Sequence, residues 1–407
     1  MNPKIYTADE HGISLEDIDS DALFVMERLR SKGFTAYLVG GSVRDLLLKE
    51  KPKDFDISTS ALPEEIRQVF RNSILIGRRF RLAHIRFGKK VIEVATFRSG
   101  ATESDALIVR DNEWGTPEQD VLRRDFTING LFFDPAEKTV IDYVGGYPDI
   151  QKKVLRTIGQ AYLRFRQDPV RMIRLIKFQA RFGLDIDPEA KLALVDCRSE
   201  IIKSSQARIL EELLRMLESR AAQPFFRLMT QNGVLQLLLP GLGAFLETED
   251  GEDVYSFLRE VDTTFHAPEQ MPLDRSVLLS CLLFPLFETH LKVHYLDRDK
   301  KPHLGEIFHE ARTSTDELFR PFFLLPRKLK VSVVSILTTQ YRLTPLEKKK
   351  QVRLRAPSDP DFPLALKFLE VRACLEPGLK QTWEAWQEVE LPSPDSPPPR
   401  RRRRRRR

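Results

Sequence analysis

The sequence predicts an α+β head domain followed by helical domains and a short disordered tail. Residues 1–150 mix short apolar runs typical of strands with amphipathic stretches typical of helices, whereas strand signals nearly vanish further along. From Leu391 the chain turns to Pro, Ser and Arg, a composition that cannot bury a core. We therefore expect a helical neck over 151–220, a helical body over 221–390 and a tail over 391–407.

The elements of the head are short segments separated by turns. The stretch 19–30 has apolar residues at helical spacing, and residues 88–90 separate two apolar runs as in a hairpin. The polar stretch 99–116 indicates a loop. In order, we predict helix 19–30, strand 37–39, helix 63–70, strand 73–76, strands 82–87 and 91–97, helix 117–131 and strand 139–143. The helices predicted beyond the head are 168–182, 188–197, 205–219, 223–238, 253–265 and 274–288.

Length and composition favour a cytoplasmic protein of several domains. At 407 residues the chain is too long for one compact core, and its 42% apolar content is ordinary for a globular protein. Cys197, Cys281 and Cys374 are far apart and odd in number, which argues against a disulfide framework and fits a reducing compartment. The longest apolar run, Ser276 to Phe287, has about a dozen residues, so we expect no membrane span.

The positive charge is concentrated at the C-terminus. The net charge is +6, but eight of the 65 basic residues are the consecutive arginines of 400–407, which leaves 57 basic against 59 acidic residues elsewhere. Such a tail has no fold to stabilise, so we expect it to contact the phosphates of a nucleic acid. An acidic protein partner is the alternative.

The stretch from Tyr37 to Thr59 carries the most informative pattern. An apolar strand ends at Gly40 and Gly41, Ser42 is a predicted N-cap, and apolar residues then recur at helical spacing. Two glycines let backbone N–H groups approach an anion beside a helix N-terminus, and Arg44 adds a forked donor suited to phosphate. Taken alone, a Gly-Gly pair after a strand is more often a turn without a binding function.

Two aspartates follow as Asp54-Phe55-Asp56. In a strand, which we predict here, both carboxylates would face one side and could hold Mg²⁺ with a bound triphosphate. Taken alone, such a pair more often belongs to a solvated strand edge. Glu93 stands in an otherwise apolar strand, so it either reaches solvent at an edge or joins the metal site as a third carboxylate. Together these parts favour nucleotidyl transfer.

The order Gly-Gly-x-x-Arg-Asp and then Asp-x-Asp resembles the signature of the class II branch of the polymerase-β-like nucleotidyltransferases. That family holds the bacterial poly(A) polymerases and the CCA-adding enzymes. A second block, R-R-D-F-T-I-N over 123–129, is similar to the family's second signature. From its residues alone it could be a capped helix end with a salt bridge. The resemblance implies that Arg124 and Asp125 face the ribose and phosphates, with Asp125 among the active-site carboxylates.

A third block begins at Asp168 and Pro169, which as N-cap and first residue would open a helix. Arg171, Arg174 and Lys177 then recur every third residue as a basic stripe. The family's D-x-x-R pair matches Asp168 and Arg171 and implies that they read the base edge. A carboxylate accepts from an exocyclic amine while a guanidinium donates to the ring nitrogen beside it, which suits adenine and cytosine. Arg174 is expected to bind the nucleotide as well.

Lesser marks separate the two enzyme types of this family. The segment I-G-R-R-F-R-L-A-H-I over 76–85 and the arginine-rich end after 383–386 resemble bacterial poly(A) polymerases. The resemblance implies template-independent addition of AMP from ATP to RNA 3′ ends, with two Mg²⁺ ions at Asp54 and Asp56. It also implies RNA contacts by neck, body and tail, with proteins of RNA decay as partners. One alternative is a CCA-adding tRNA nucleotidyltransferase. The other is a catalytically inactive RNA-binding protein, but the presence of every expected carboxylate disfavours this second alternative.

Overall fold

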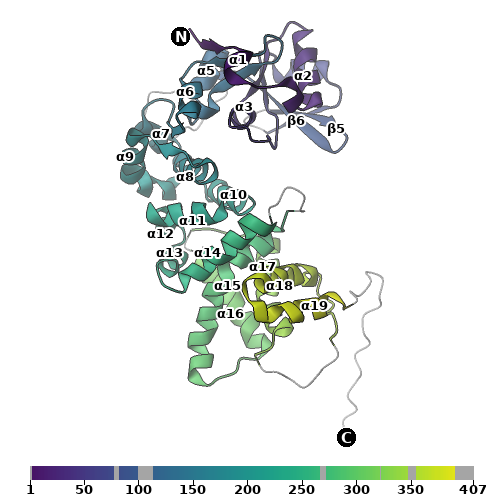
Figure 1. Cartoon of the computed structure of the whole chain (residues 1–407), viewed down its shortest axis with the longest axis vertical. Helices are drawn as coiled ribbons and strands as arrows, with labels where there is room; N and C mark the ends of the chain where they lie inside the picture. The colour runs from purple at the N-terminus through teal and green to yellow at the C-terminus, as the bar shows by residue number, and fades with distance from the viewer. Residues whose placement is uncertain are drawn as a thin grey trace. The chain divides into compact units, whose positions relative to one another are not determined.

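The chain divides into two compact units, residues 1–204 and 205–407 (Figure 1). The computed structural model describes residues 2–77, 82–99, 113–265, 272–320, 322–346 and 354–389. The arginine tail, most of the predicted 99–116 loop and part of the 76–85 segment lie outside these residues. The finer division of the chain into head, neck and body stays a prediction.

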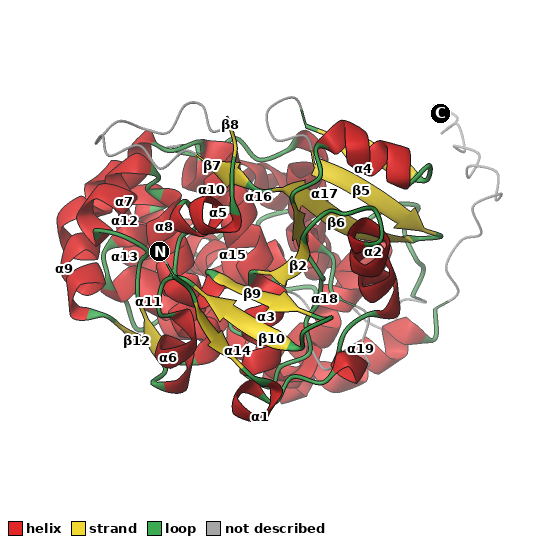
Figure 2. Cartoon of the chain, turned by 90° about the horizontal axis from the view of Figure 1, so that it is seen from above, coloured by secondary structure: helices red, strands yellow, loops and turns green. Residues whose placement is uncertain are grey.

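An eight-stranded mixed sheet forms the centre of the first unit (Figure 2). Neighbouring strands are antiparallel except β3 and β6, which run parallel. The predicted hairpin is confirmed as β5 and β6. In spatial order the strands are β1 (Lys4–Tyr6), β10 (Thr139–Asp142), β9 (Leu131–Asp134), β2 (Ala36–Val39), β3 (Ile57–Thr59), β6 (Lys90–Thr96), β5 (Leu82–Phe87) and β4 (Ser73–Ile76). Two further pairs join β7 (Arg98–Ser99) to β8 (Glu113–Trp114) and β11 (Val154–Leu155) to β12 (Asp185–Ile186).

Short helices pack on this sheet, and α7, α8 and α9 follow it as a group that packs together. The side chain of Asp19 caps α2 by accepting from the backbone N–H groups of Asp21 and Ala22, and α2 packs on β2 and β3. α3 packs on β2 and β9, so its N-terminus lies at the end of β2. The helices are α1 (Ala8–His11), α2 (Ser20–Arg30), α3 (Gly41–Leu47), α4 (Pro63–Val69), α5 (Pro117–Leu122), α6 (Gly146–Gln151), α7 (Ala161–Gln167), α8 (Val170–Phe182) and α9 (Pro188–Cys197), with the 3₁₀ turns η1 (Leu15–Asp17), η2 (Thr127–Asn129) and η3 (Arg198–Lys203).

The predicted helix over 117–131 is wrong beyond its first two turns. α5 stops at Leu122, the chain makes the turn η2, and then enters β9. Phe126 is fully buried and forms an isolated bridge with Thr157, so tertiary pairing overrides the helical pattern.

The described part of the second unit consists only of helices and turns. Phe257, Phe284 and Phe368 are buried against one another, with ring centroids 5.3 to 6.1 Å apart. The predicted helix 223–238 is two helices, divided where Gly233 adopts φ +68°. The elements are α10 (Gln206–Leu217), α11 (Ala222–Gln231), α12 (Val234–Leu238), α13 (Pro240–Phe245), α14 (Gly251–Glu260), η4 (Val261–Phe265), α15 (Arg275–His294), η5 (Leu296–Arg298), α16 (Leu304–Phe319), α17 (Arg327–Leu343), α18 (Phe362–Leu375), η6 (Pro377–Leu379) and α19 (Lys380–Gln387).

The stretch Arg275–Arg298, which contains α15, is long and apolar enough to cross a membrane by length and composition. It is longer than the apolar run seen in the sequence. However, 67% of its most apolar window is buried inside the protein, as in the core helix of a folded domain.

Candidate active site

The glycine turn between β2 and α3 depends on Gly40. This residue is the N-cap of α3 and adopts φ +67° and ψ −124°, which only glycine reaches without strain. A Cβ at Gly40 would lie 3.0 Å from Nη1 of Arg124, so the turn and that guanidinium are in close contact. The predicted N-cap, Ser42, is wrong: Ser42 lies inside α3, where its Oγ donates to the Val39 carbonyl at 2.9 Å. Gly41 is the first helical residue.

The Asp-Phe-Asp segment lies immediately before β3, so its predicted place within the strand is wrong. The Asp56 carbonyl still accepts from the Val39 N–H at 3.0 Å, which keeps Asp56 in register with β2. Ile57 pairs with Val94 in the parallel β3–β6 ladder. Asp56 and Glu93 each precede a member of that pair, so their side chains are neighbours on one face.

Negative charge accumulates around Asp56, just before β3 begins. Burial, together with the charges of Glu93 and Asp54, raises the pKa of Asp56 to about 6, while the charge of Arg124 opposes the rise. Carboxylates that repel one another in this way form a donor set that suits Mg²⁺. Among the described residues, no three His, Cys, Asp or Glu side chains already stand together at metal-binding distance. The three carboxylates would therefore have to converge on a bound ion.

Glu93 also has a partner that the sequence interpretation missed. Its side chain is 48% exposed, and its Oε1 lies 3.3 Å from Nε2 of His84, the residue directly opposite it in the β5–β6 hairpin. Glu93 thus reaches solvent at a strand surface, and its charge still acts on Asp56. Its role as a third metal ligand stays a prediction. The hairpin register could have identified His84, since it follows from the turn at 88–90.

Arg124 lies between the glycine turn and the carboxylates. Its Nη2 donates to Asp120 Oδ2 at 2.8 Å and to Ser58 Oγ of β3 at 3.4 Å. Its charge favours the ionised form of Asp56. The structure therefore brings Gly40, Asp56 and Arg124 together around one end of β2 and β3.

Arg44 and Asp125 lie elsewhere, in the interior. Arg44 is only 5% exposed, and its Nη1 donates to Asn129 Oδ1 at 2.6 Å. Burial alone would raise the pKa of Asp125, but the charge of Arg174 and the hydrogen bond from Asn129 hold that pKa well below its usual range. The predicted contact of Arg44 with phosphate and the predicted catalytic role of Asp125 stay predictions, because the structure engages both side chains with other protein groups.

Helix α8 carries the third block. Its N-cap is Pro169, one residue later than predicted, and Asp168 lies between α7 and α8 with its carbonyl accepting from the Arg171 N–H at 3.0 Å. Arg171 is buried, and its Nη2 donates to the Arg123 carbonyl at 3.0 Å. Arg174 Nε donates to Asp125 Oδ2 at 2.6 Å. The second and third blocks are thus joined.

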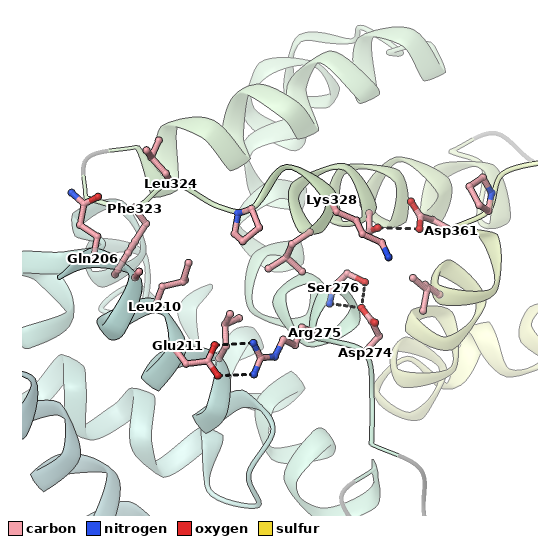
Figure 3. Close-up of a pocket in the computed structure, with 17 residues that line it drawn as sticks. Gln206, Leu210, Glu211, Asp274, Arg275, Ser276, Phe323, Leu324, Lys328 and Asp361 are labelled. Carbon is pink, nitrogen blue, oxygen red and sulfur yellow. Dashed lines mark hydrogen bonds and ion pairs between the residues drawn. The ribbon is translucent and has the colours of Figure 1, made fainter. Parts of the chain in front are cut away.

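The second unit contains a cavity of about 930 Å³ (Figure 3). Leu210 of α10 and Phe323 contribute apolar surface. Glu211 and Arg275, which form an ion pair with each other, also line the cavity. Its lining includes none of the predicted site residues. The cavity is therefore a feature separate from the carboxylates.

Comparison with known proteins decides the family. The description "Poly A polymerase head domain" matches residues 36–156, and "Probable RNA and SrmB- binding site of polymerase A" matches 183–246. Poly(A) polymerase I of Escherichia coli O6:H1 is 36% identical over 95% of this chain and 85% of its own length. The chain belongs to the bacterial poly(A) polymerase family.

CCA-adding enzymes are also similar to this chain, but over a smaller part of it or at lower identity. The CCA-adding enzyme of Lactobacillus johnsonii is 35% identical over 54% of this chain and 56% of its own length. A crystal structure of the Bacillus stearothermophilus CCA-adding enzyme in complex with CTP covers 90% of this chain and 81% of its own, with 23% identity and a TM-score of 0.59. That likeness shows the fold, an α+β nucleotidyltransferase head followed by helices, as predicted.

Proposed function

We propose that this protein adds AMP from ATP to RNA 3′ ends without a template. The RNA 3′-oxygen attacks the α-phosphorus of ATP, the bond between the α- and β-phosphates breaks, and pyrophosphate leaves. The observation that carries this proposal is the similarity to poly(A) polymerase I along 95% of the chain. Asp54, Asp56 and Glu93, whose charges act on one another, would supply the metal ligands that such a reaction needs.

Asp54 and Asp56, with Glu93 as a third donor, would hold Mg²⁺. The bound ions would lower the pKa of the 3′-hydroxyl and neutralise charge on the triphosphate. The mutual repulsion at Asp56 supports this role, because a cation among the carboxylates relieves it. Asp56 is held in place by its backbone bond to β2, so its side chain starts from a fixed position.

The triphosphate would lie at the turn of Gly40 and Gly41, where α3 begins. Gly40 allows close approach of the backbone, and the N-terminus of α3 favours negative charge. Arg124 touches this turn and supplies a cation beside it. Arg44 is buried within α3 and bonded to other protein groups, so it would position the turn instead of touching the phosphates.

Asp168 and Arg171 would select the base. The carboxylate would accept from the adenine amine, and Arg171 would donate to the neighbouring ring nitrogen. Arg171 is held by its bond to the Arg123 carbonyl, so its guanidinium has a defined direction. Guanine and uracil offer a carbonyl beside an N–H and mismatch both groups.

One assay tests the proposal. Purified protein with Mg²⁺ is given ATP or CTP and either oligo(A) or tRNA lacking its 3′ end. We expect long A tails on oligo(A) with ATP. An extension of two or three nucleotides confined to tRNA would instead establish CCA addition. This alternative is tested because a CCA-adding enzyme is 35% identical over 54% of this chain. Binding without extension would indicate an inactive RNA-binding protein.

The arginine tail gives a further prediction. If most of the eight arginines of 400–407 contact phosphates, deleting them should flatten the slope of log affinity against log salt by roughly 3 to 5, since each neutralised phosphate of single-stranded RNA contributes about 0.7. Single-turnover chemistry at saturating RNA should stay nearly intact. A truncated protein with the full-length slope would show that the tail is not an RNA anchor.

A further inference from the structure

Six polar side chains of the first unit form one continuous series of hydrogen bonds that begins and ends on α8. We call this series the polar circuit. It links α8 to α3, which follows the glycine turn, and to η2 with the residues just before it. In order its members are Arg181, Asp45, Arg44, Asn129, Asp125 and Arg174.

One half of the polar circuit joins α8 to α3. Arg181 Nη2 donates to Asp45 Oδ2 at 3.2 Å. Arg44 donates to the other oxygen of the same carboxylate, with Nε at 2.8 Å and Nη2 at 2.6 Å. Asp45 is only 4% exposed, and the guanidinium groups of Arg44 and Arg181 balance its charge.

The other half returns from α3 to α8. Arg44 Nη1 donates to Asn129 Oδ1 at 2.6 Å, and Asn129 Nδ2 donates to Asp125 Oδ1 at 2.9 Å. Arg174 Nε closes the series by donating to Asp125 Oδ2 at 2.6 Å. Arg174 and Arg181 are seven residues apart, so they lie on one face of α8 two turns from each other.

Two aromatic rings of α8 pack against arginines of the polar circuit. The guanidinium carbon of Arg44 lies 4.9 Å from the ring centre of Phe178 and 4.7 Å from that of Phe182. The two rings are stacked with centroids 6.1 Å apart. Arg174 and Arg181 each lie over one of these rings as well. Packing and hydrogen bonds therefore restrain the same face of α8.

We propose that the polar circuit sets nucleotide discrimination by fixing α8 relative to the glycine turn. This inference rests on the proposed function. Asp168 and Arg171 stand at the start of α8, and Gly40 and Gly41 stand at the start of α3, so the circuit connects the two helices that would hold the base and the triphosphate of one nucleotide. Its members act as positioning residues. A base edge displaced by about 1 Å loses the alignment on which its selection depends.

The hydrogen bonds of Arg44 inside the protein support this role. All three nitrogens of its guanidinium donate to Asp45 or Asn129, and the group lies against the rings of Phe178 and Phe182. Its Nη2 also lies beside the glycine turn, 3.4 Å from where a Cβ at Gly41 would stand. Arg44 thus connects the start of α3 to Asp45 and to Asn129.

The test uses Arg181→Gln, Asp45→Asn and the double variant in the full-length protein. Arg181 is 37% exposed, so its replacement leaves the core intact. We expect the ratio of kcat/KM for ATP to that for GTP to fall about tenfold in each single variant. The double variant should fall no further than the larger single loss, because both changes break the same series. Arg181→Lys, which keeps the charge, should restore most of the ratio.

Arg156→Gln is the matched control. Arg156 also pairs with two carboxylates of the first unit, Asp149 and Asp187, but it takes no part in the polar circuit. This control should lose stability without a change in the ATP to GTP ratio. If Arg181→Gln behaves like the control, or if the double variant loses the product of the two single losses, the proposal is overturned.

Binding of ATP and GTP, measured by calorimetry without RNA, separates this proposal from the proposed function. A wild-type protein that prefers ATP but never extends RNA would overturn the proposed function alone. In that case the affinity ratio of the same variants still decides the role of the polar circuit.

Discussion

Replacing Asp56 by Asn is expected to lower the rate of AMP addition by roughly a thousandfold or more, because a metal ion that stabilises the charge developing in the transition state accelerates such reactions strongly. Asp56 is the carboxylate on which burial and the charges of Glu93 and Asp54 converge. The amide keeps the shape of the side chain but removes the charge that would attract the ion. Single-turnover extension of oligo(A) at saturating ATP measures the effect.

RNA affinity should change little in the same variant, because the RNA loses no cationic contact. Asp21→Asn is a suitable control, since Asp21 is a partly exposed aspartate of the same unit whose carboxylate pairs with Lys90. It should leave the rate unchanged. An Asp56→Asn protein that retains more than a tenth of the wild-type rate would remove Asp56 from the metal site, and Asp54→Asn provides the same test for its neighbour.

The local part of the site could be predicted from the sequence. The strand, the glycine turn and the short helix follow from patterns within a dozen residues, and β2, Gly40 and α3 are where these patterns place them. The error at Ser42 has a local cause as well. Gly40 adopts a positive φ as the N-cap, so the helix begins at Gly41 and Ser42 already lies inside it. The hydroxyl of Ser42 therefore donates to the Val39 carbonyl instead of capping the helix.

The partners of the interior charged side chains could not be predicted from such local patterns. A sequence motif gives the same letters to an arginine that binds phosphate and to one that binds a buried carboxylate. For Arg44 the partners in the structure, Asn129 and Phe178, lie far along the chain on other elements. Asp45 was likewise missed, although it belongs to the Gly-Gly-x-x-Arg-Asp pattern, because nothing nearby in sequence indicates its bond to Arg181.

Base selection gives the second large effect. Replacing Asp168 by Asn should reduce the preference for ATP over GTP by about 1–3 kcal/mol, roughly five- to 150-fold. The carboxylate can only accept a hydrogen bond, as the adenine amine requires. An amide can also turn its NH₂ group toward the guanine carbonyl, so it no longer rejects GTP. Asn is as good a helix-terminal residue as Asp, and removing Arg171 instead would disturb a buried side chain bonded to the Arg123 carbonyl.

The chain offers a matched control in Asp187→Asn. Asp187, like Asp168, precedes a proline at the start of a helix, and its side chain caps α9 by accepting from the Glu189 N–H at 3.2 Å. Both variants therefore change an Asp-Pro helix start in the same unit, but only Asp168 belongs to the pair that would read the base. We expect the ratio of kcat/KM values for ATP and GTP to fall in Asp168→Asn and to stay at the wild-type value in Asp187→Asn. If the two variants keep the same ratio and differ only in melting temperature, Asp168 serves the junction of α7 and α8, and the base is read by other residues.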